Sequence, residues 1–71
     1  MIKNPKAGMA VVFRNKGGNT EEYPFLSGVI DCIKPLLGGF WSVRTSIGRR
    51  LVFDHEMYPT LDEAIAANKE E

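Results

Sequence analysis

FWSVRTSIGRRLVFD, residues 40–54, is the stretch that decides the fold. Residues 40–45 are rich in aromatic and β-branched side chains, which favour a strand. Residues 46–48, Ser-Ile-Gly, then reverse the chain, and residues 49–54 return as a second apolar run. The stretch therefore predicts an antiparallel hairpin.

Two further segments upstream of this hairpin predict strands. Residues 9–14, MAVVFR, are short, apolar and β-branched. Residues 28–34, GVIDCIK, favour a strand because two β-branched residues are adjacent and Pro35 disfavours the helical conformation just before it. The apolar spacing there also fits a helical stripe, so an α+β fold with a helix over residues 28–37 stays open as the alternative.

A C-terminal helix is expected to follow the strands. Thr60 and Glu63 have the spacing of a capping box, in which the hydroxyl and the carboxylate satisfy free backbone N–H groups. We expect the helix to run from residue 61 to 69. The side chains expected to dock on the sheet are Leu61, Ala64 and Ile65.

The whole pattern predicts a single small domain over residues 8–69. Residues 1–7 have no periodicity and are expected to form a flexible arm, and residues 70–71 a frayed tail. Pro24 cannot donate to a strand ladder, so residues 21–27 are expected to form an edge or a loop. The fold class is therefore mainly β, with four to five strands and one C-terminal helix.

Composition excludes several classes of protein. The 71 residues include one Cys and one His, too few for a disulfide framework or a structural zinc site. No apolar run approaches the roughly 20 residues needed to cross a bilayer, and the first residues do not form a secretory signal. We therefore expect a soluble, cytoplasmic domain with no membrane partner.

The order of the predicted strands resembles the small SH3-like barrels, a superfamily that includes KOW-, Tudor- and signalling SH3-type modules. The resemblance covers residues 8–54 and implies a bent antiparallel sheet or barrel with the helix as an added lid. Phe40 matches the aromatic that lines the peptide groove of signalling SH3 domains, but their Tyr-rich motif has no counterpart near the first strand. The side chains expected to point inward are Ile30, Cys32, Trp41, Val43, Leu51 and Phe53, joined by Val11 or Val12.

Two other resemblances suggest different ligands. Tudor-like barrels hold a methylated cation in an aromatic cage, a role open here to Tyr23, Phe25, Phe40 and Tyr58. Residues 40–69 also resemble the three-stranded sheet and helix of integrase-arm DNA-binding domains. That resemblance would place Arg44, Arg49 and Arg50 in a DNA groove.

Charge is balanced in sum but not along the chain. Residues 1–50 carry eight basic and three acidic side chains, and residues 51–71 carry one basic and six acidic ones. Arg49 and Arg50 are expected close to Arg44 across the hairpin, where like charges repel unless an anion or a carboxylate lies between them. That group is either supplied by a partner or by Asp62, Glu63 or the acidic tail of the same chain.

The residue types that perform catalysis are not arranged for it. Three consecutive residues such as Asp54, His55 and Glu56 rarely hold one metal ion, because neighbours in an extended segment point to opposite sides. Cys32 lies in an apolar strand and is expected to be a buried, inert thiol. The Gly-rich residues 15–20 lack phosphate-loop spacing and are expected to form a turn. We expect no enzyme activity, no cofactor and no metal site.

The remaining hypotheses concern binding. Loops and strand starts hold more apolar side chains than so small a domain can bury, which predicts a non-catalytic module that binds and regulates another protein. Regulators of this size are common among phages and mobile elements, where they modulate host complexes. The residues expected to bind the partner are Tyr23, Phe25, Phe40, Arg44, Arg49 and Arg50.

Two alternatives stay open, and the oligomeric state is not predicted. The first is a small nucleic-acid-binding barrel, which would use Lys16, Arg44, Arg49 and Arg50. The second is an accessory subunit of an enzyme.

Overall fold

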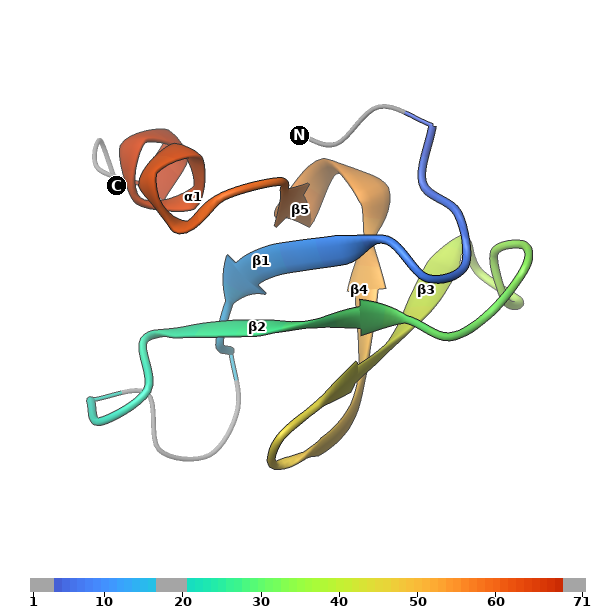
Figure 1. Ribbon diagram of the computed structural model, residues 1–71, viewed down its shortest axis with the longest axis horizontal. Helices are drawn as coiled ribbons and strands as arrows, with labels where there is room; N and C mark the ends of the chain where they lie inside the picture. The colour runs from blue at the N-terminus through green and yellow to red at the C-terminus, as the bar shows by residue number, and fades with distance from the viewer. Residues whose placement is uncertain (1–3, 17–20, 69–71) are drawn as a thin grey trace.

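The computed structural model describes residues 4–16 and 21–68, and all its strands belong to one antiparallel sheet (Figure 1). The five strands lie in the order β4-β3-β2-β1-β5, followed along the chain by one helix. The predicted mainly β fold with a C-terminal helix is confirmed. The elements are β1 (Ala10–Arg14), β2 (Phe25–Ile30), β3 (Phe40–Thr45), β4 (Gly48–Phe53), the short 3-10 helix η1 (Asp54–Glu56), β5 (Met57–Tyr58) and α1 (Leu61–Asn68).

Strand β2 lies in the middle of the sheet and pairs with β1 on one side and β3 on the other. The alternative helix over residues 28–37 is therefore wrong, and so is the edge or loop expected for residues 25–27. Pro24 stands just before the strand, where no ladder bond from it is needed. The strand is also shorter than predicted at its other end, because it stops at Ile30 and residues 31–39 form a loop with a turn at residues 37–38.

The β3–β4 hairpin has a turn one residue shorter than predicted. Only residues 46–47 lie between the strands, and Trp41 pairs with Val52. A shift of one residue moves every side chain of a strand to the other face. Val52 therefore faces the core, and the prediction that Leu51 and Phe53 point inward is wrong: the Leu51 side chain is 56% exposed.

The core lies against one face of the strongly bent sheet. The predicted inward side chains of Ile30, Trp41 and Val43 are buried, as is Val11 of the first strand, while Cys32 is half-buried against them. Strand β5 contributes another buried side chain, that of Met57. The apolar core consists of Val11, Phe13, Leu26, Ile30, Trp41, Val43, Val52 and Met57.

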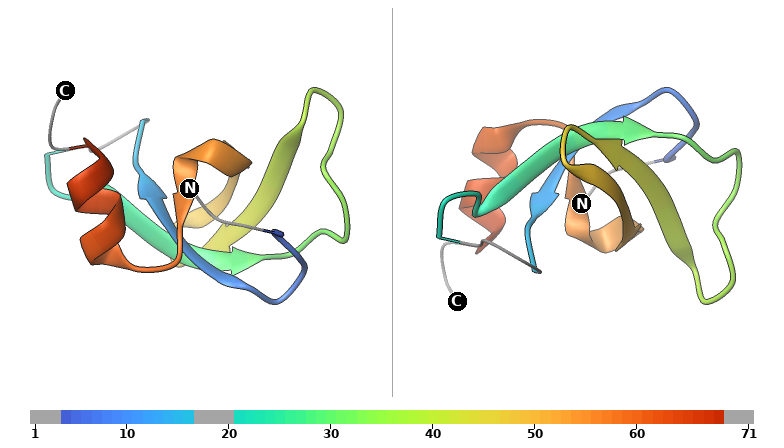
Figure 2. Two further views of the ribbon diagram at one scale, coloured as in Figure 1. Left: turned by 90° about the horizontal axis from the view of Figure 1, so that it is seen from above. Right: turned by 90° about the horizontal axis from the view of Figure 1, so that it is seen from below.

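Helix α1 packs on the β5-β1-β2 part of the sheet, and one half of the predicted capping box is present: the Thr60 hydroxyl caps the helix, while the Glu63 carboxylate accepts that hydroxyl over 3.2 Å in place of a backbone N–H. The Glu63 N–H donates to Thr60 Oγ1 over 3.2 Å. Of the three side chains expected to dock, only Ala64 is buried, while Leu61 and Ile65 are about half exposed. The views in Figure 2 place α1 at one end of the molecule and the 31–39 loop at the other.

The segment before β1 is tied to the end of β2. The Gly8 N–H donates to Ile30 O over 2.8 Å, and the Ile30 N–H donates to Met9 O over 3.0 Å. Residues 1–3 of the predicted arm, residues 17–20 of the predicted turn and residues 69–71 at the C-terminus lie outside the described part. No helix among the described residues is both long and apolar enough to cross a bilayer.

Candidate functional site

The face of β2, β3 and β4 that points away from the core carries a mixed apolar and charged surface. Strand alternation places Val29, Arg44 and Arg49 side by side in one row, since Val29 pairs with Arg44 and Arg44 with Arg49. Asp31 follows β2 and donates its N–H to Ser42 O over 3.0 Å. We call this surface the outer patch and define it as Val29, Asp31, Phe40, Ser42, Arg44, Arg49, Leu51 and Phe53.

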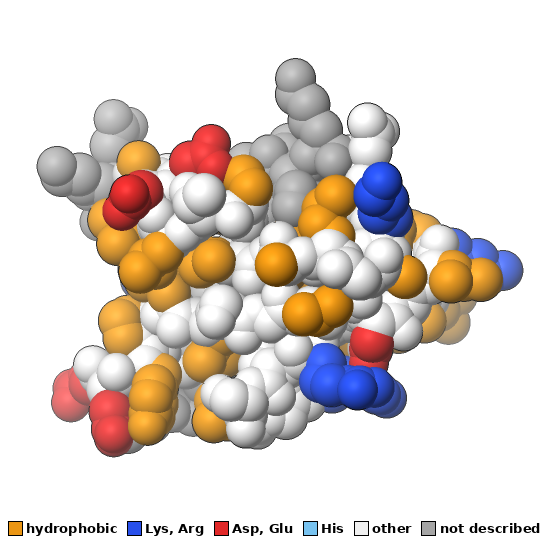
Figure 3. Space-filling view, viewed as in Figure 1, with side chains coloured by type: hydrophobic (Ala, Val, Ile, Leu, Met, Phe, Trp, Pro, Cys, Tyr) orange, Lys and Arg blue, Asp and Glu red, His pale blue; other side chains and the backbone are white. Residues whose placement is uncertain are grey.

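A carboxylate holds the two arginines of the outer patch together. Asp31 Oδ2 lies 3.0 Å from Arg49 Nη2 and 3.9 Å from Arg44 Nη2. The Asp31 side chain is only 15% exposed, whereas both guanidinium groups remain largely in solvent. This group was expected from a partner or from Asp62, Glu63 or the acidic tail; the structure places Asp31 there instead, so the assignment to Asp62 or Glu63 is wrong. On the face shown in Figure 3, blue side chains gather around a red one at the lower right, beside apolar ones.

The charged state of Asp31 is favoured by its surroundings. The Ser42 hydroxyl lies beside the carboxylate without a fully aligned hydrogen bond. That hydroxyl, followed by Arg49 and Arg44, holds the pKa of the Asp31 carboxyl below its ordinary value of 3.8, against the opposing effect of burial. Asp31 is therefore ionised at neutral pH, and the arginine pair is held in place.

Aromatic rings form a short stack at the far end of the outer patch. The Phe40 and Phe53 centroids are 4.2 Å apart with 28° between the ring planes, and His55 stacks on Phe53 at 5.3 Å and 14°. Both phenylalanine side chains are half-buried. Phe53 is thus engaged by a ring on either side, which fixes its position and leaves little of its face for a ligand.

An exposed apolar loop borders this aromatic stack. The loop folds back onto the start of β3, because the Leu36 N–H donates to Phe40 O over 2.7 Å. Leu37 at its tip is fully exposed, and Ile33 is 86% exposed. The outer patch and this loop together leave a run of apolar side chains uncovered by the described residues.

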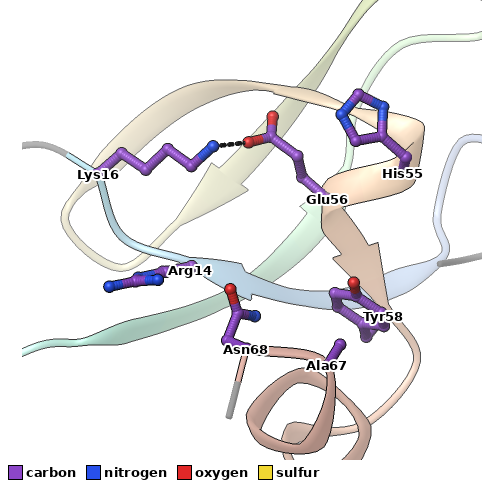
Figure 4. A pocket seen from close by; sticks show the side chains of 7 residues that line it. All are labelled: Arg14, Lys16, His55, Glu56, Tyr58, Ala67 and Asn68. Atoms are coloured by element: carbon purple, nitrogen blue, oxygen red, sulfur yellow. Dashed lines mark hydrogen bonds and ion pairs between the residues drawn. The ribbon is translucent and has the colours of Figure 1, made fainter. Parts of the chain in front are cut away.

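The other basic residues gather elsewhere, around Glu56. Its carboxylate binds Lys16 Nζ through Oε2 and accepts the Phe53 N–H at Oε1 over 3.1 Å. Figure 4 shows Lys16 reaching Glu56 across a groove of about 310 Å³, while Arg14 points away from them. The groove is lined by Arg14, Lys16, His55, Glu56, Tyr58, Ala67 and Asn68.

Glu56 is also ionised at neutral pH. Burial raises the pKa of its carboxyl, but the hydrogen bonds from Lys16 and from the Phe53 backbone, together with the charge of Lys16, outweigh burial and bring the pKa below 4.5. Glu56 therefore links the ends of β1 and β4 as a charged group.

The residues predicted to bind a partner lie at separate places in the structure. Phe40, Arg44 and Arg49 lie together on the outer patch. Phe25 begins β2 and Tyr23 lies two residues before it, at the end of the strand drawn in teal beside α1 in Figure 2. The four-residue aromatic cage therefore does not form, because Phe40 is separated from its other members by the length of β2.

Arg50, the last residue of that predicted set, lies on the opposite face of β4 from Arg49. Its side chain turns along the strand edge, where Nη1 donates to Arg49 O over 3.2 Å. The predicted nucleic-acid contacts are thus split: Arg44 and Arg49 share Asp31, whereas Lys16 binds Glu56 on another face.

Sequence reasoning missed five of the eight residues of the outer patch. Leu51 and Phe53 were assigned to the core, and Val29, Asp31 and Ser42 were given no role. A turn of two residues in place of three would have led to the correct prediction for β4, because it places residues 49, 51 and 53 on the same face as Arg44. The exposure of Val29, 45%, then follows from its place opposite Arg44.

The residues considered for catalysis have local partners. His55 Nδ1 lies 3.8 Å from Asp54 Oδ1, while Glu56 is turned toward Lys16. The half-buried Cys32 accepts a hydrogen bond from the Ser42 N–H, with 3.3 Å between N and Sγ. Among residues 4–16 and 21–68, no group of three or more His, Cys, Asp or Glu side chains could hold a metal ion.

Comparison of the chain with protein-family models, with curated proteins and with solved structures found no match.

Proposed function

We propose that this chain is a non-catalytic module that binds another protein through the outer patch and the apolar loop beside it. One observation carries the proposal: Leu37, Leu51 and Val29 expose 100%, 56% and 45% of their surface next to a stacked aromatic pair and two ordered arginines. Aromatic and apolar anchors with arginines at the rim are typical of protein interfaces. The Asp31 carboxylate holds these arginines in place, so less side-chain freedom is lost on binding.

The arginines define the chemistry of the partner. Two guanidinium groups share one carboxylate, so the outer patch keeps one uncompensated positive charge. Guanidinium groups bind carboxylates through paired hydrogen bonds. The fitting partner surface is apolar at its centre and carries an Asp or Glu side chain at its edge.

Nucleic acid fits this surface less well than a protein does. A phosphate backbone needs several cations along one track, whereas Lys16 and Arg50 lie apart from the Arg44–Arg49 pair. Base stacking needs free ring faces, and those of Phe53 are engaged by Phe40 and His55. An enzyme that uses this chain as an accessory subunit is one form of the proposed protein partner.

The test is affinity capture from a lysate of the native cells, with the immobilised chain and three variants. Val29→Glu places a carboxylate opposite Arg44, which preserves the sheet but adds charge to the outer patch. Leu37→Asp alters a fully exposed side chain that contributes nothing to the core. Ile65→Glu, on α1, is the matched control, since Ile65 and Val29 are 44% and 45% exposed.

We expect the wild type and Ile65→Glu to retain the same proteins, and Val29→Glu and Leu37→Asp to lose at least about nine-tenths of them. Equal retention by all four chains would contradict the proposal. Binding to DNA or RNA that weakens steeply with salt, with no protein retained, would favour the nucleic-acid alternative instead.

A further inference from the structure

A second groove lies where α1 packs beside the start of β2, at the end of the molecule opposite the 31–39 loop (Figure 2). It has a volume of about 330 Å³ and is lined mainly by apolar atoms. Ile65 is 44% exposed there and Phe25 is half-buried, so the described residues leave its apolar floor uncovered. We call it the α1 groove and define it by its lining residues, Arg14, Pro24, Phe25, Ile65 and Asn68.

The apolar loop, residues 31–39, is the corresponding protrusion at the other end of the molecule. Leu37 is fully exposed and Ile33 is 86% exposed, so the described part of the chain covers neither side chain. Two hydrogen bonds hold the tip in shape: the Leu36 N–H donates to Phe40 O over 2.7 Å, and the Gly39 N–H donates to Leu36 O over 2.9 Å. The protrusion is therefore formed before it binds, which lowers the entropy lost on binding.

The charges beside the protrusion and beside the groove are opposite and unpaired. The Lys34 side chain, in the loop, has no hydrogen-bond or ion-pair partner among the residues that the structure describes. The Asp62 side chain likewise has none there, and it lies about one helical turn before Ile65 on α1. Helix α1 carries two acidic residues and no basic one. The loop end of one copy is therefore attracted to the α1 end of another.

We propose that the apolar loop of one copy of this chain binds in the α1 groove of a second copy. Leu37 then packs against Phe25 and Ile65, and Lys34 lies beside Asp62. None of these side chains has to leave a hydrogen-bond or ion-pair partner in the described part of its own chain. Because the two surfaces lie at opposite ends, the contact is heterologous and joins copies head to tail rather than as a two-fold pair.

A second copy accounts for both uncovered surfaces at once. An unrelated protein in the α1 groove would leave the apolar loop exposed, and one at the loop would leave the groove exposed. Copies of the chain supply loop and groove in equal number. The inference goes beyond the proposed function and limits it, because a loop bound in a groove hides Leu37 from any other protein partner.

Complementation between two variants tests this contact in the full chain. Leu37→Asp removes the apolar tip and leaves the α1 groove intact, while Ile65→Glu places a charge in the groove and leaves the tip intact. Neither residue belongs to the buried core, so both variants are expected to fold. A heterologous contact predicts that each variant alone is monomeric, whereas their equimolar mixture forms a one-to-one dimer. In that dimer one chain supplies the loop and the other the groove.

We expect sedimentation equilibrium of the wild type to show a weight-average mass that rises with concentration and passes that of a dimer by about 1 mM, since so small a contact is weak. Lys34→Glu should raise the dissociation constant at least about threefold, and Asp62→Lys in the same chain should restore it. A wild type that remains monomeric at about 1 mM would overturn the proposal. So would a mixture of Leu37→Asp and Ile65→Glu that contains monomers only.

This experiment and the capture experiment fail independently. Val29→Glu changes neither the apolar loop nor the α1 groove, so it should associate as the wild type does even if it captures no protein. Ile65→Glu keeps the outer patch and the apolar loop, so its capture of a protein partner tests the proposed function alone.

Discussion

Asp31 is the residue on which the order of the outer patch depends. It lies between two arginines that strand pairing places directly opposite each other, and it is the only acidic side chain among residues 23–53. Without a carboxylate there, two like charges would face each other across the hairpin and destabilise it. A single side chain thus links the stability of the sheet to the geometry of the candidate site.

Replacement of this carboxylate is expected to lower stability in a pH-dependent way. Because the folded-state pKa of Asp31 lies below 3.8, its contribution is complete above that value and is lost as the pH falls through the folded-state pKa. Asp31→Asn should therefore lower the urea midpoint at pH 7, and the difference from the wild type should shrink below pH 3.8. Asp54→Asn, at a carboxylate that is 52% exposed, is the control and should have little effect. A difference that stays constant down to pH 3 would contradict this role.

Gly28 shows how little space separates the strands at the bend. It pairs with Thr45 on the core side of β2, and a Cβ built there would lie 2.3 Å from the carbonyl oxygen of Arg44. The same atom would lie 2.8 Å from Val43 Cγ1. The backbone must move to accept any side chain at this position.

Gly28→Ala is expected to cost about 2 kcal/mol of unfolding free energy, because overpacking forces the two strands apart. Ser27→Ala, at the exposed neighbouring position, should change that free energy by no more than about 0.5 kcal/mol. Urea denaturation followed by Trp41 fluorescence measures both. Equal stability of the two variants would show that the bend does not require glycine.

At the scale of elements, α1 and the β3–β4 hairpin depend on different signals. The helix has eight residues, too few to persist in isolation, so it relies on its cap and on the burial of Ala64 against the sheet. The hairpin depends on its turn. Gly48, with φ of +121°, looks like a turn residue in the sequence but is the first residue of β4.

The cap of α1 gives a prediction at this scale. Thr60→Ala removes the acceptor of the Glu63 N–H and should destabilise the folded chain by about 1 kcal/mol. Thr60→Ser keeps the hydroxyl and is expected to retain most of that stability. Urea denaturation gives the free energies, and amide exchange at residues 61–64 locates the change. A Thr60→Ser variant as unstable as Thr60→Ala would show that the hydroxyl is not the cause.

At the scale of the whole molecule, Glu56 connects segments that are distant along the chain. It joins Lys16, just after β1, to the backbone of Phe53 at the end of β4. The two strands occupy different parts of the sheet order, β4-β3-β2-β1-β5, and η1 passes between β4 and β5. This carboxylate therefore helps to hold the bent sheet together.

Low pH is expected to break the contacts that Glu56 makes with Lys16 and with the Phe53 N–H. The folded-state pKa of Glu56 is below 4.5, so its stabilising contribution is present above pH 4.5 and is lost as the pH falls through the folded-state value. The Phe53 amide proton shift, followed by NMR, should titrate with a midpoint below 4.5. In Glu56→Gln this titration should disappear and the stability at pH 7 should fall. A Phe53 amide shift that is independent of pH between 3 and 7 would contradict the assignment.

The sequence by itself determined the local features of this protein. Adjacent β-branched and aromatic residues established the strands at residues 10–14 and 40–45, and the Thr60–Glu63 spacing established where the helix begins. Val43 and Trp41 were assigned correctly to the core because alternation within one strand needs no knowledge of its neighbours. The repulsion expected between the arginines across the hairpin also followed from local charge alone.

Only the tertiary structure decided which face of the sheet each side chain lies on and which residue it contacts. The register of β4 depends on a turn of two residues rather than three, a difference of a single residue that moved Leu51 and Phe53 from the core to the surface. The choice of Asp31 over the more abundant helix carboxylates depends on which side chain the bent sheet brings within 3.0 Å of Arg49. Strand formation is set by neighbouring residues, whereas side-chain pairing is set by packing between segments far apart in the chain, and short-range sequence patterns carry little information about it.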